Sequence, residues 1–165
     1  DQMYRVGSNN EDLPIFPAEA APYTAHGLRR VVAIVLLRNV AGRQDAAEVL
    51  LEVVCTPGKL QGQACFPTGV NQPGETMWAA AVRKGRQELN IEVLGEPVSL
   101  GVWDFEGVSA VEYLLVQKFL GEPLSRREHY ELRWAHPSDL NSTVPMFGTE
   151  MLALEALQSR LKVLR

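Results

Sequence analysis

Residues 69–91, GVNQPGETMWAAAVRKGRQELNI, combine a loop that contains two glycines with the strongest helix pattern in the chain. Glycine allows a backbone to approach a ligand closely or to take positive φ. The helix is predicted over Thr76–Asn90, because Glu75 and Thr76 provide N-terminal capping chemistry and Asn90 tolerates the left-handed conformation that ends a helix. Free amides at a helix N-terminus suit phosphate oxygens. The stretch therefore predicts a loop and helix that bind an anionic ligand.

Positions 84, 87 and 88 lie on one face of the predicted helix, since residues three and four apart are neighbours there. Three carboxylates at these positions would form an oxygen-rich site for Mg²⁺, and one of them could act as a general base toward water. This chain has Lys84, Gln87 and Glu88 instead, so the formal charges of the face sum to zero. An ammonium group repels a divalent cation, which predicts a weakened Mg²⁺ site.

The spacing resembles the Nudix hydrolase signature. That signature is Gly, five residues, Glu, seven residues, then Arg-Glu-apolar-any-Glu-Glu-any-Gly-apolar. Five of its nine specified positions are present here, namely Gly69, Glu75, Arg83, Glu88 and Ile91, and Asn90 is a near match. The flanking Phe66-Pro67 and Pro73-Gly74 also resemble the family.

The resemblance implies a Nudix-like α/β/α sandwich with a mixed β-sheet from about residue 29 onward. It implies catalytic positions at Glu75, Arg83 and Glu88, with Arg83 orienting carboxylates through bidentate hydrogen bonds, and we expect Arg83 to pair with Glu75. The departures concern catalysis. Lys84 stands where the family has a Glu that assists catalysis or binds metal, and Gln87 stands where the family has a metal-ligating Glu.

The candidate ligand-binding residues are Lys84, Gln87, Gly69 and Phe105. Lys84 has two interpretations: a helix-surface residue paired with Glu88, or a point charge that holds a phosphate in place of the metal. Phe105 is a candidate for stacking on a nucleobase, with packing in the core as the alternative for the aromatic residues near it.

The candidate metal ligands are Glu88 and Glu112. Nudix enzymes often supply a further acid from the later strands, and Glu112 lies in the segment that matches them. The alternative for Glu112 is ordinary surface exposure, as for most charged residues.

The remaining pattern predicts strands and a second helix in one domain over residues 28–165, preceded by an arm or loop over residues 1–27 that carries Pro14, Pro17 and Pro22. Glu106-Gly107 is predicted to join two of the strands, and Gly42–Asp45 to form a turn. The predicted strands are Arg29–Arg38, Ala47–Cys55, Cys65–Val70, Val98–Asp104, Ala110–Leu120 and Tyr130–Ala135, and the closing helix is Thr149–Leu164.

Composition narrows the function classes. The formal net charge of −4 argues against broad nucleic-acid binding, which needs a basic surface, but not against one bound RNA end. The two cysteines and three histidines lack zinc-ligand spacing. No apolar run is long enough to cross a membrane, so we expect an intracellular protein with no membrane partner. The compartment and the oligomeric state stay open, because a chain that begins at Asp1 is compatible with a processed or excised piece.

These features favour a degenerate Nudix domain that binds a nucleotide, a phosphorylated RNA 5′ end or a protein partner with little or no hydrolysis. The alternative is a working Mg²⁺-dependent pyrophosphohydrolase, which would act on nucleoside-diphosphate-linked compounds or 5′-triphosphate RNA and would use Glu75, Glu88 and Glu112. A purely structural interaction module is the third class.

Overall fold

The computed structural model describes residues 23–24, 26–39, 47–140 and 148–163. Its strands are β1 Arg29–Asn39, β2 Ala47–Val54, β3 Ala64–Cys65, β4 Thr68–Val70, β5 Glu92–Val93, β6 Val98–Phe105, β7 Ser109–Val116, β8 Phe119–Leu120 and β9 Tyr130–Ala135. Its helices are α1 Met77–Leu89, α2 Gly148–Val163 and the short 3₁₀ helix η4 Pro137–Asp139. Within these residues no helix is long and apolar enough to span a membrane.

Strand β1 is the centre of a mixed sheet. It pairs in parallel with β7 along one edge. Its other edge is shared, because its first half pairs antiparallel with β4 and its last residues pair antiparallel with β2. A strand with neighbours on both edges and helices on both faces must be apolar on both faces, as the sequence VVAIVLL is.

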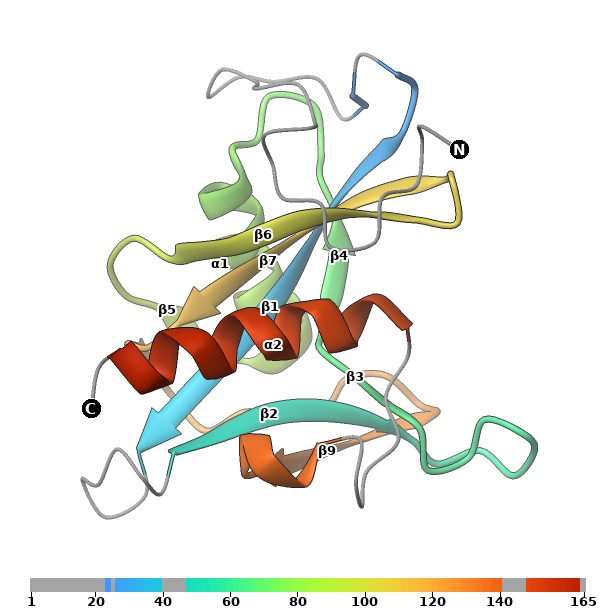
Figure 1. Ribbon diagram of the computed structural model, residues 1–165, viewed down its shortest axis with the longest axis vertical. Coiled ribbons are helices and arrows are strands. Elements are labelled where there is room, and N and C mark those ends of the chain that lie inside the picture. Colours follow the sequence, from blue (N-terminus) through green and yellow to red (C-terminus); the bar gives the residue numbers. More distant parts are fainter. Residues whose placement is uncertain (1–22, 25, 40–46, 141–147, 164–165) are drawn as a thin grey trace.

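The two faces of this sheet form separate cores. Even-numbered residues of β1, such as Ile34, pack on the core that contains Ala80, Ala81 and Leu89 of α1. Odd-numbered residues pack on the core that contains Leu154 and other residues of α2. Figure 1 shows α2 in front of the sheet and α1 behind it. The predicted α/β/α sandwich with a mixed sheet is therefore confirmed.

Two predicted strands differ from the structure by more than one residue at an end. The predicted strand Cys65–Val70 is divided at Phe66-Pro67, so that β3 pairs with β2 and β4 pairs with β1. Proline has no N–H to donate to a ladder, and the Pro67 carbonyl instead accepts from Ile34 N at 2.8 Å. The predicted strand Ala110–Leu120 ends at Val116, because Phe119 and Leu120 pair with β5 in a separate two-stranded sheet.

Other predicted elements agree with the structure or lie outside the described residues. Strand β9 has the predicted bounds, and β6 and β7 are joined by a tight turn in which Glu106 and Gly107 both have positive φ. The predicted turn Gly42–Asp45 and most of the predicted arm lie outside the described residues. The division into an arm and one domain stays a prediction.

Helix α1 begins and ends as its sequence predicts. The Thr76 hydroxyl accepts a hydrogen bond from Ala79 N at 2.9 Å, and Asn90 takes the left-handed conformation with φ of 58°. Gly85 allows the helix to approach β5 closely, because a Cβ atom there would lie 3.3 Å from side-chain carbons of both Ile91 and Val93. The glycine that lowers helix propensity thus serves the packing of α1.

Candidate functional site

Lys84 and Glu88 lie on the side of α1 that faces strands β2 and β4. Their ion pair has an Nζ–Oε1 distance of 3.4 Å, with side-chain exposures of 18% and 30%. A charge-assisted hydrogen bond is usually 2.7–2.9 Å long, so this pair is loose. An ammonium group has three hydrogens to donate, and Glu88 uses one of them within the described residues. Lys84 therefore keeps donors for another anion.

The side chain of Lys84 lies directly against the backbone of Gly69. A Cβ atom built on Gly69 would overlap the Cγ, Cδ and Cε atoms of Lys84. Gly69 is buried within β4 and pairs with Val32 of β1, so the loop backbone is held in place there. The sequence predicted that a glycine in this loop lets a ligand approach the backbone closely. In the structure it is the Lys84 side chain that lies against Gly69.

Two further charged residues complete what we call the four-charge cluster: Lys84, Glu88, Glu52 and Arg127. Glu52 lies on β2, is only 2% exposed, and interacts electrostatically with both Glu88 and Lys84. Arg127 reaches it from the segment between β8 and β9, with Nη1 3.0 Å from Glu52 Oε1. The cluster holds two positive and two negative groups, so its formal charge is zero.

The pKa of Glu52 is raised from its ordinary value mainly by burial, and the charge of Arg127 opposes that shift. The Arg127 guanidinium also lies over the Tyr130 ring, 4.0 Å from its centroid. A buried carboxylate is costly unless it is paired, and Arg127 supplies that partner.

Arg83 holds the loop to the helix. Its Nε lies 2.6 Å from Glu75 Oε2 and its Nη2 lies 2.9 Å from Glu75 Oε1, which is the expected bidentate pair. The same guanidinium donates to the Val70 carbonyl at 3.0 Å and to Gln87 Oε1 at 3.1 Å. The hydrogen bonds that Glu75 accepts from Arg83 lower the pKa of its carboxyl, and the Gln72 N–H adds to this effect. Arg83 thus fixes the loop to the helix, and both carboxylate oxygens of Glu75 are taken up by its hydrogen bonds.

The residues present fit a divalent cation poorly. The Nudix resemblance implies Mg²⁺ or a similar divalent metal, which needs several oxygen ligands. In the described part of the chain no three acidic, histidine or cysteine side chains are grouped so that they could hold a metal ion. The Glu88 carboxylate already has the Lys84 ammonium beside it. The described residues therefore do not form a site suited to a divalent cation.

Glu112 and Phe105 lie apart from the four-charge cluster. Glu112 is in register with Val32 and, across it, with Gly69, so it lies two strands from Gly69, about 10 Å away at ordinary strand spacing. Phe105 ends β6 and is 37% exposed. It follows Trp103 by two residues, so its side chain lies on the same face of the sheet as Trp103, which belongs to the α2 core, and on the opposite face from Lys84. Within the described residues no hydrogen bond or ion pair joins either residue to Lys84.

Neither Glu52 nor Arg127 is among the site residues predicted from the sequence. The sequence does contain a signal for Glu52, which is the one charged residue in the apolar run VLLEVV. A glutamate that is buried in such a strand should be paired with a positive charge. Its partner is 75 residues away and could not be identified from the pattern. Trp78, on the first turn of α1, is 43% exposed.

We predict a stability coupling between Gly69 and Lys84. Gly69→Ala should lower the free energy of unfolding by about 1–3 kcal/mol, the usual cost of overpacking, because Lys84 must move aside. In a Lys84→Ala background the same change should cost clearly less, since the overlapping methylenes are gone. Urea unfolding of the four proteins of this double-mutant cycle measures the coupling. Equal costs in both backgrounds would show that Lys84 does not lie on Gly69.

Comparison with known proteins identifies the relatives of this chain. The family described as NUDIX domain matches residues 27–154, which is most of the sequence. No curated protein sequence matches the chain.

Solved structures with the same fold are distant in sequence. MutT, from a study of Aliivibrio salmonicida and Vibrio cholerae, is 23% identical with a TM-score of 0.61, over 79% of this chain and 99% of that chain. The NUDIX domain of Shewanella oneidensis NrtR, solved with ADP ribose, is 16% identical with a TM-score of 0.63, over 82% and 89%. A C. elegans Ap4A hydrolase is 21% identical with a TM-score of 0.57, over 81% and 98%. Identities this low establish the fold alone.

Proposed function

Since this chain belongs to the NUDIX domain family, we propose that it binds a nucleotide or the phosphorylated 5′ end of an RNA at the four-charge cluster, with little or no hydrolysis. The family relation makes a nucleotide-linked ligand the natural class, because NrtR was solved with ADP ribose and another relative is an Ap4A hydrolase. Both properties belong to those proteins, and their extension to this chain is part of the proposal.

The position of Lys84 is the observation that carries the proposal. Its ammonium lies on the helix face where a metal would need carboxylates, its stem rests on Gly69, and its only ion pair within the described residues is a loose one of 3.4 Å. A lysine in this position supplies one positive charge without a metal and can donate to phosphate oxygens directly. Binding is therefore expected to proceed without Mg²⁺.

Chemical turnover is expected to be low for the same reason. Glu88 is the one carboxylate on the face formed by positions 84, 87 and 88. Glu75 is held by Arg83, so it is not free to activate water. Loss of a general acid or base typically costs on the order of 10²–10⁴ in rate.

The test is calorimetric titration of the protein with nucleoside triphosphates, ADP ribose and short 5′-phosphorylated RNAs, with Mg²⁺ and with chelator. We expect at least one of these ligands to bind equally well in both conditions. Lys84→Glu should weaken that binding about tenfold or more, since a hydrogen bond to a charged group contributes about 1.5–3 kcal/mol. The matched control is Lys59→Glu, an exposed lysine in the β2–β3 connection, which should bind as the wild type does.

A parallel hydrolysis assay separates this proposal from the pyrophosphohydrolase alternative. Saturable Mg²⁺-dependent turnover of any of these ligands that disappears in Glu88→Gln would support the enzyme and contradict the proposal. Absence of binding by all of them, with and without Mg²⁺, would also contradict it and would favour a structural module.

A further inference from the structure

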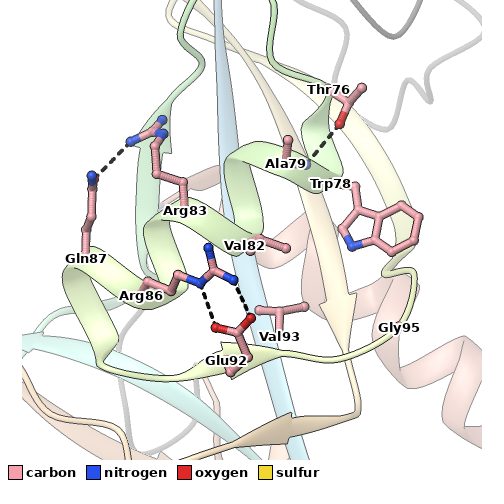
Figure 2. A pocket seen from close by; sticks show the side chains of 10 residues that line it. All are labelled: Thr76, Trp78, Ala79, Val82, Arg83, Arg86, Gln87, Glu92, Val93 and Gly95. Atoms are coloured by element: carbon pink, nitrogen blue, oxygen red, sulfur yellow. Dashed lines mark hydrogen bonds and ion pairs between the residues drawn. The ribbon is translucent and has the colours of Figure 1, made fainter.

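Arg127 presents an unoccupied hydrogen-bonding edge beside the four-charge cluster. The Nε and Nη2 atoms of an arginine form a planar fork that suits two neighbouring acceptor atoms. In other arginines this edge binds a glutamate carboxylate, namely in Arg38, Arg83 and Arg86. Figure 2 shows this arrangement for Arg86 and Glu92. Arg127 differs, because it holds Glu52 through Nη1 alone, and its Nε and Nη2 atoms have no hydrogen-bond partner within the described residues.

The orientation of Arg127 is fixed at several points. Its Nη1 lies 3.0 Å from Glu52 Oε1, and its Cζ lies over the Tyr130 ring, 4.0 Å from the centroid. Its backbone N–H donates to Ser125 Oγ at 3.4 Å, and its carbonyl accepts from the Tyr130 N–H at 3.3 Å. The side chain is still 38% exposed, so a ligand can reach it. A side chain that is held in this way loses little conformational entropy when it binds a ligand.

Arg127 meets the cluster on the face of the sheet where Lys84 lies. Glu52 follows Leu50 by two residues along β2, so its side chain points toward the core that contains α1. There Glu52 interacts electrostatically with both Arg127 and Lys84. A ligand whose phosphate contacts Lys84 therefore has the open edge of Arg127 as a neighbour.

The charge balance favours uncharged acceptors at this edge. The charge of Arg127 is already balanced by Glu52, and the formal charge of the whole four-charge cluster is zero. A second phosphate at Arg127 would place its negative charge near two carboxylates, those of Glu52 and Glu88, which repel it. A nucleobase offers acceptor atoms without that charge. The edge of Arg127 therefore suits a base better than a further phosphate.

Guanine is the base whose edge fits this fork. Among the base edges that face the major groove of DNA, only that of guanine carries two neighbouring acceptors, N7 and O6, and arginine binds this pair bidentately. Adenine has an amino group in place of O6, which would face a second donor. We propose that Nε and Nη2 of Arg127 bind O6 and N7 of a guanine, and that the ligand of the four-charge cluster is a guanine nucleotide. This assignment rests on the proposed binding of a phosphate by Lys84.

Calorimetric titration of the full chain with four nucleoside triphosphates, in the presence of chelator, tests the assignment. GTP should bind about tenfold more tightly than ATP, which is within the usual discrimination of a bidentate contact. ITP keeps both O6 and N7 and should bind as GTP does. In 7-deaza-GTP a carbon replaces N7, so its binding should be about fivefold weaker than that of GTP. All four ligands carry the same triphosphate, so their differences report on the base alone.

Variants separate the base contact from the phosphate contact. Arg127→Lys keeps a positive charge beside Glu52 but removes the planar fork, so the preference for GTP over ATP should be lost. Lys84→Glu should weaken the binding of GTP and ATP by the same factor and leave that preference in place. The matched control is Arg126→Lys, an exposed change one residue away, which should keep the preference. The nucleotide series on the wild type does not depend on the folding of any variant.

The possible outcomes distinguish this assignment from the proposed function. Equal affinities of the wild type for GTP and for ATP or CTP would overturn the guanine assignment and leave nucleotide binding at Lys84 in place. If inorganic triphosphate binds as tightly as GTP and Arg127→Lys weakens it, then Arg127 contacts phosphate and the assignment is also overturned. Absence of binding by every nucleotide would overturn both.

Discussion

Glu150→Gln should raise the free energy of unfolding at pH 8 and above by several kcal/mol, and should have little effect near pH 4.5. Glu150 lies in the first turn of α2 and is 5% exposed. Burial raises the pKa of its carboxyl to about 8, and a hydrogen bond from the Phe66 N–H only partly offsets this. The Oε2 atom has no hydrogen-bond partner among the described residues. Ionisation at this position therefore costs stability.

The direction of the pH dependence follows from proton linkage. A carboxyl whose pKa is higher in the folded state than in the unfolded state adds no penalty below its ordinary pKa of 4.5, where both states are protonated. As the pH rises from 4.5 to about 8, the unfolded state loses the proton first, and stability falls by about 1.4 kcal/mol per pH unit. The penalty then stays constant, at up to about 5 kcal/mol. Glutamine keeps an oxygen for the Phe66 N–H and has no charge to bury.

Urea unfolding of the wild type and Glu150→Gln at pH 4.5, 6 and 8 measures this effect. The matched control is Glu155→Gln, an exposed change on the same helix, whose stability should differ from the wild type by less than about 0.5 kcal/mol at each pH. Parallel pH profiles for the wild type and Glu150→Gln would show that Glu150 titrates normally.

Arg127→Ala should lower the free energy of unfolding by about 2–3 kcal/mol at neutral pH. Removing one partner of a buried ion pair usually costs about 3–5 kcal/mol, because the remaining charge is uncompensated. Here the Glu52 side chain is 3% exposed but the Arg127 side chain is 38% exposed, so water screens part of the interaction and a lower value is expected. The loss of Arg127 also removes a cation that lowers the pKa of Glu52, so that pKa should rise further.

Two comparisons make this prediction specific. The destabilisation should shrink as the pH falls below the ordinary pKa of Glu52, where the carboxyl is neutral in both states. Adding Glu52→Gln to Arg127→Ala should recover most of the lost stability. Arg126→Ala is the matched control, because Arg126 is exposed and contacts only Asn90 Oδ1, at 3.2 Å, within the described residues. A similar loss in both arginine variants would contradict the pairing.

The stability of the cluster bears on the proposed function. Glu52 and Arg127 contribute one negative and one positive charge beside Lys84 and Glu88. Glu52→Gln in the wild-type background leaves the cluster with a formal charge of +1. Measuring the affinity of an anionic ligand in this variant would therefore separate the contribution of local charge from that of the Lys84 ammonium itself.

The sequence by itself determined the features that depend on short separations along the chain. The caps of α1 at Thr76 and Asn90 and the bounds of β9 follow from local backbone preferences and alternation. The Arg83–Glu75 and Lys84–Glu88 pairs were also predictable, because four- and eight-residue separations on a capped helix and its loop fix which side chains can meet.

Only the tertiary structure decided the features that join distant segments. It placed Lys84 on Gly69, paired Glu52 with a residue 75 positions away, and separated β8 from β7 to pair it with β5. It also left Trp78 of α1 43% exposed. Periodicity shows which face of a segment is apolar, but the partner of a buried charge depends on how segments pack around the sheet. The sequence therefore shows that α1 has Lys84 and Gln87 where the Nudix signature has carboxylates. The fold shows what surrounds Lys84, namely Gly69, Glu88 and the Glu52–Arg127 pair.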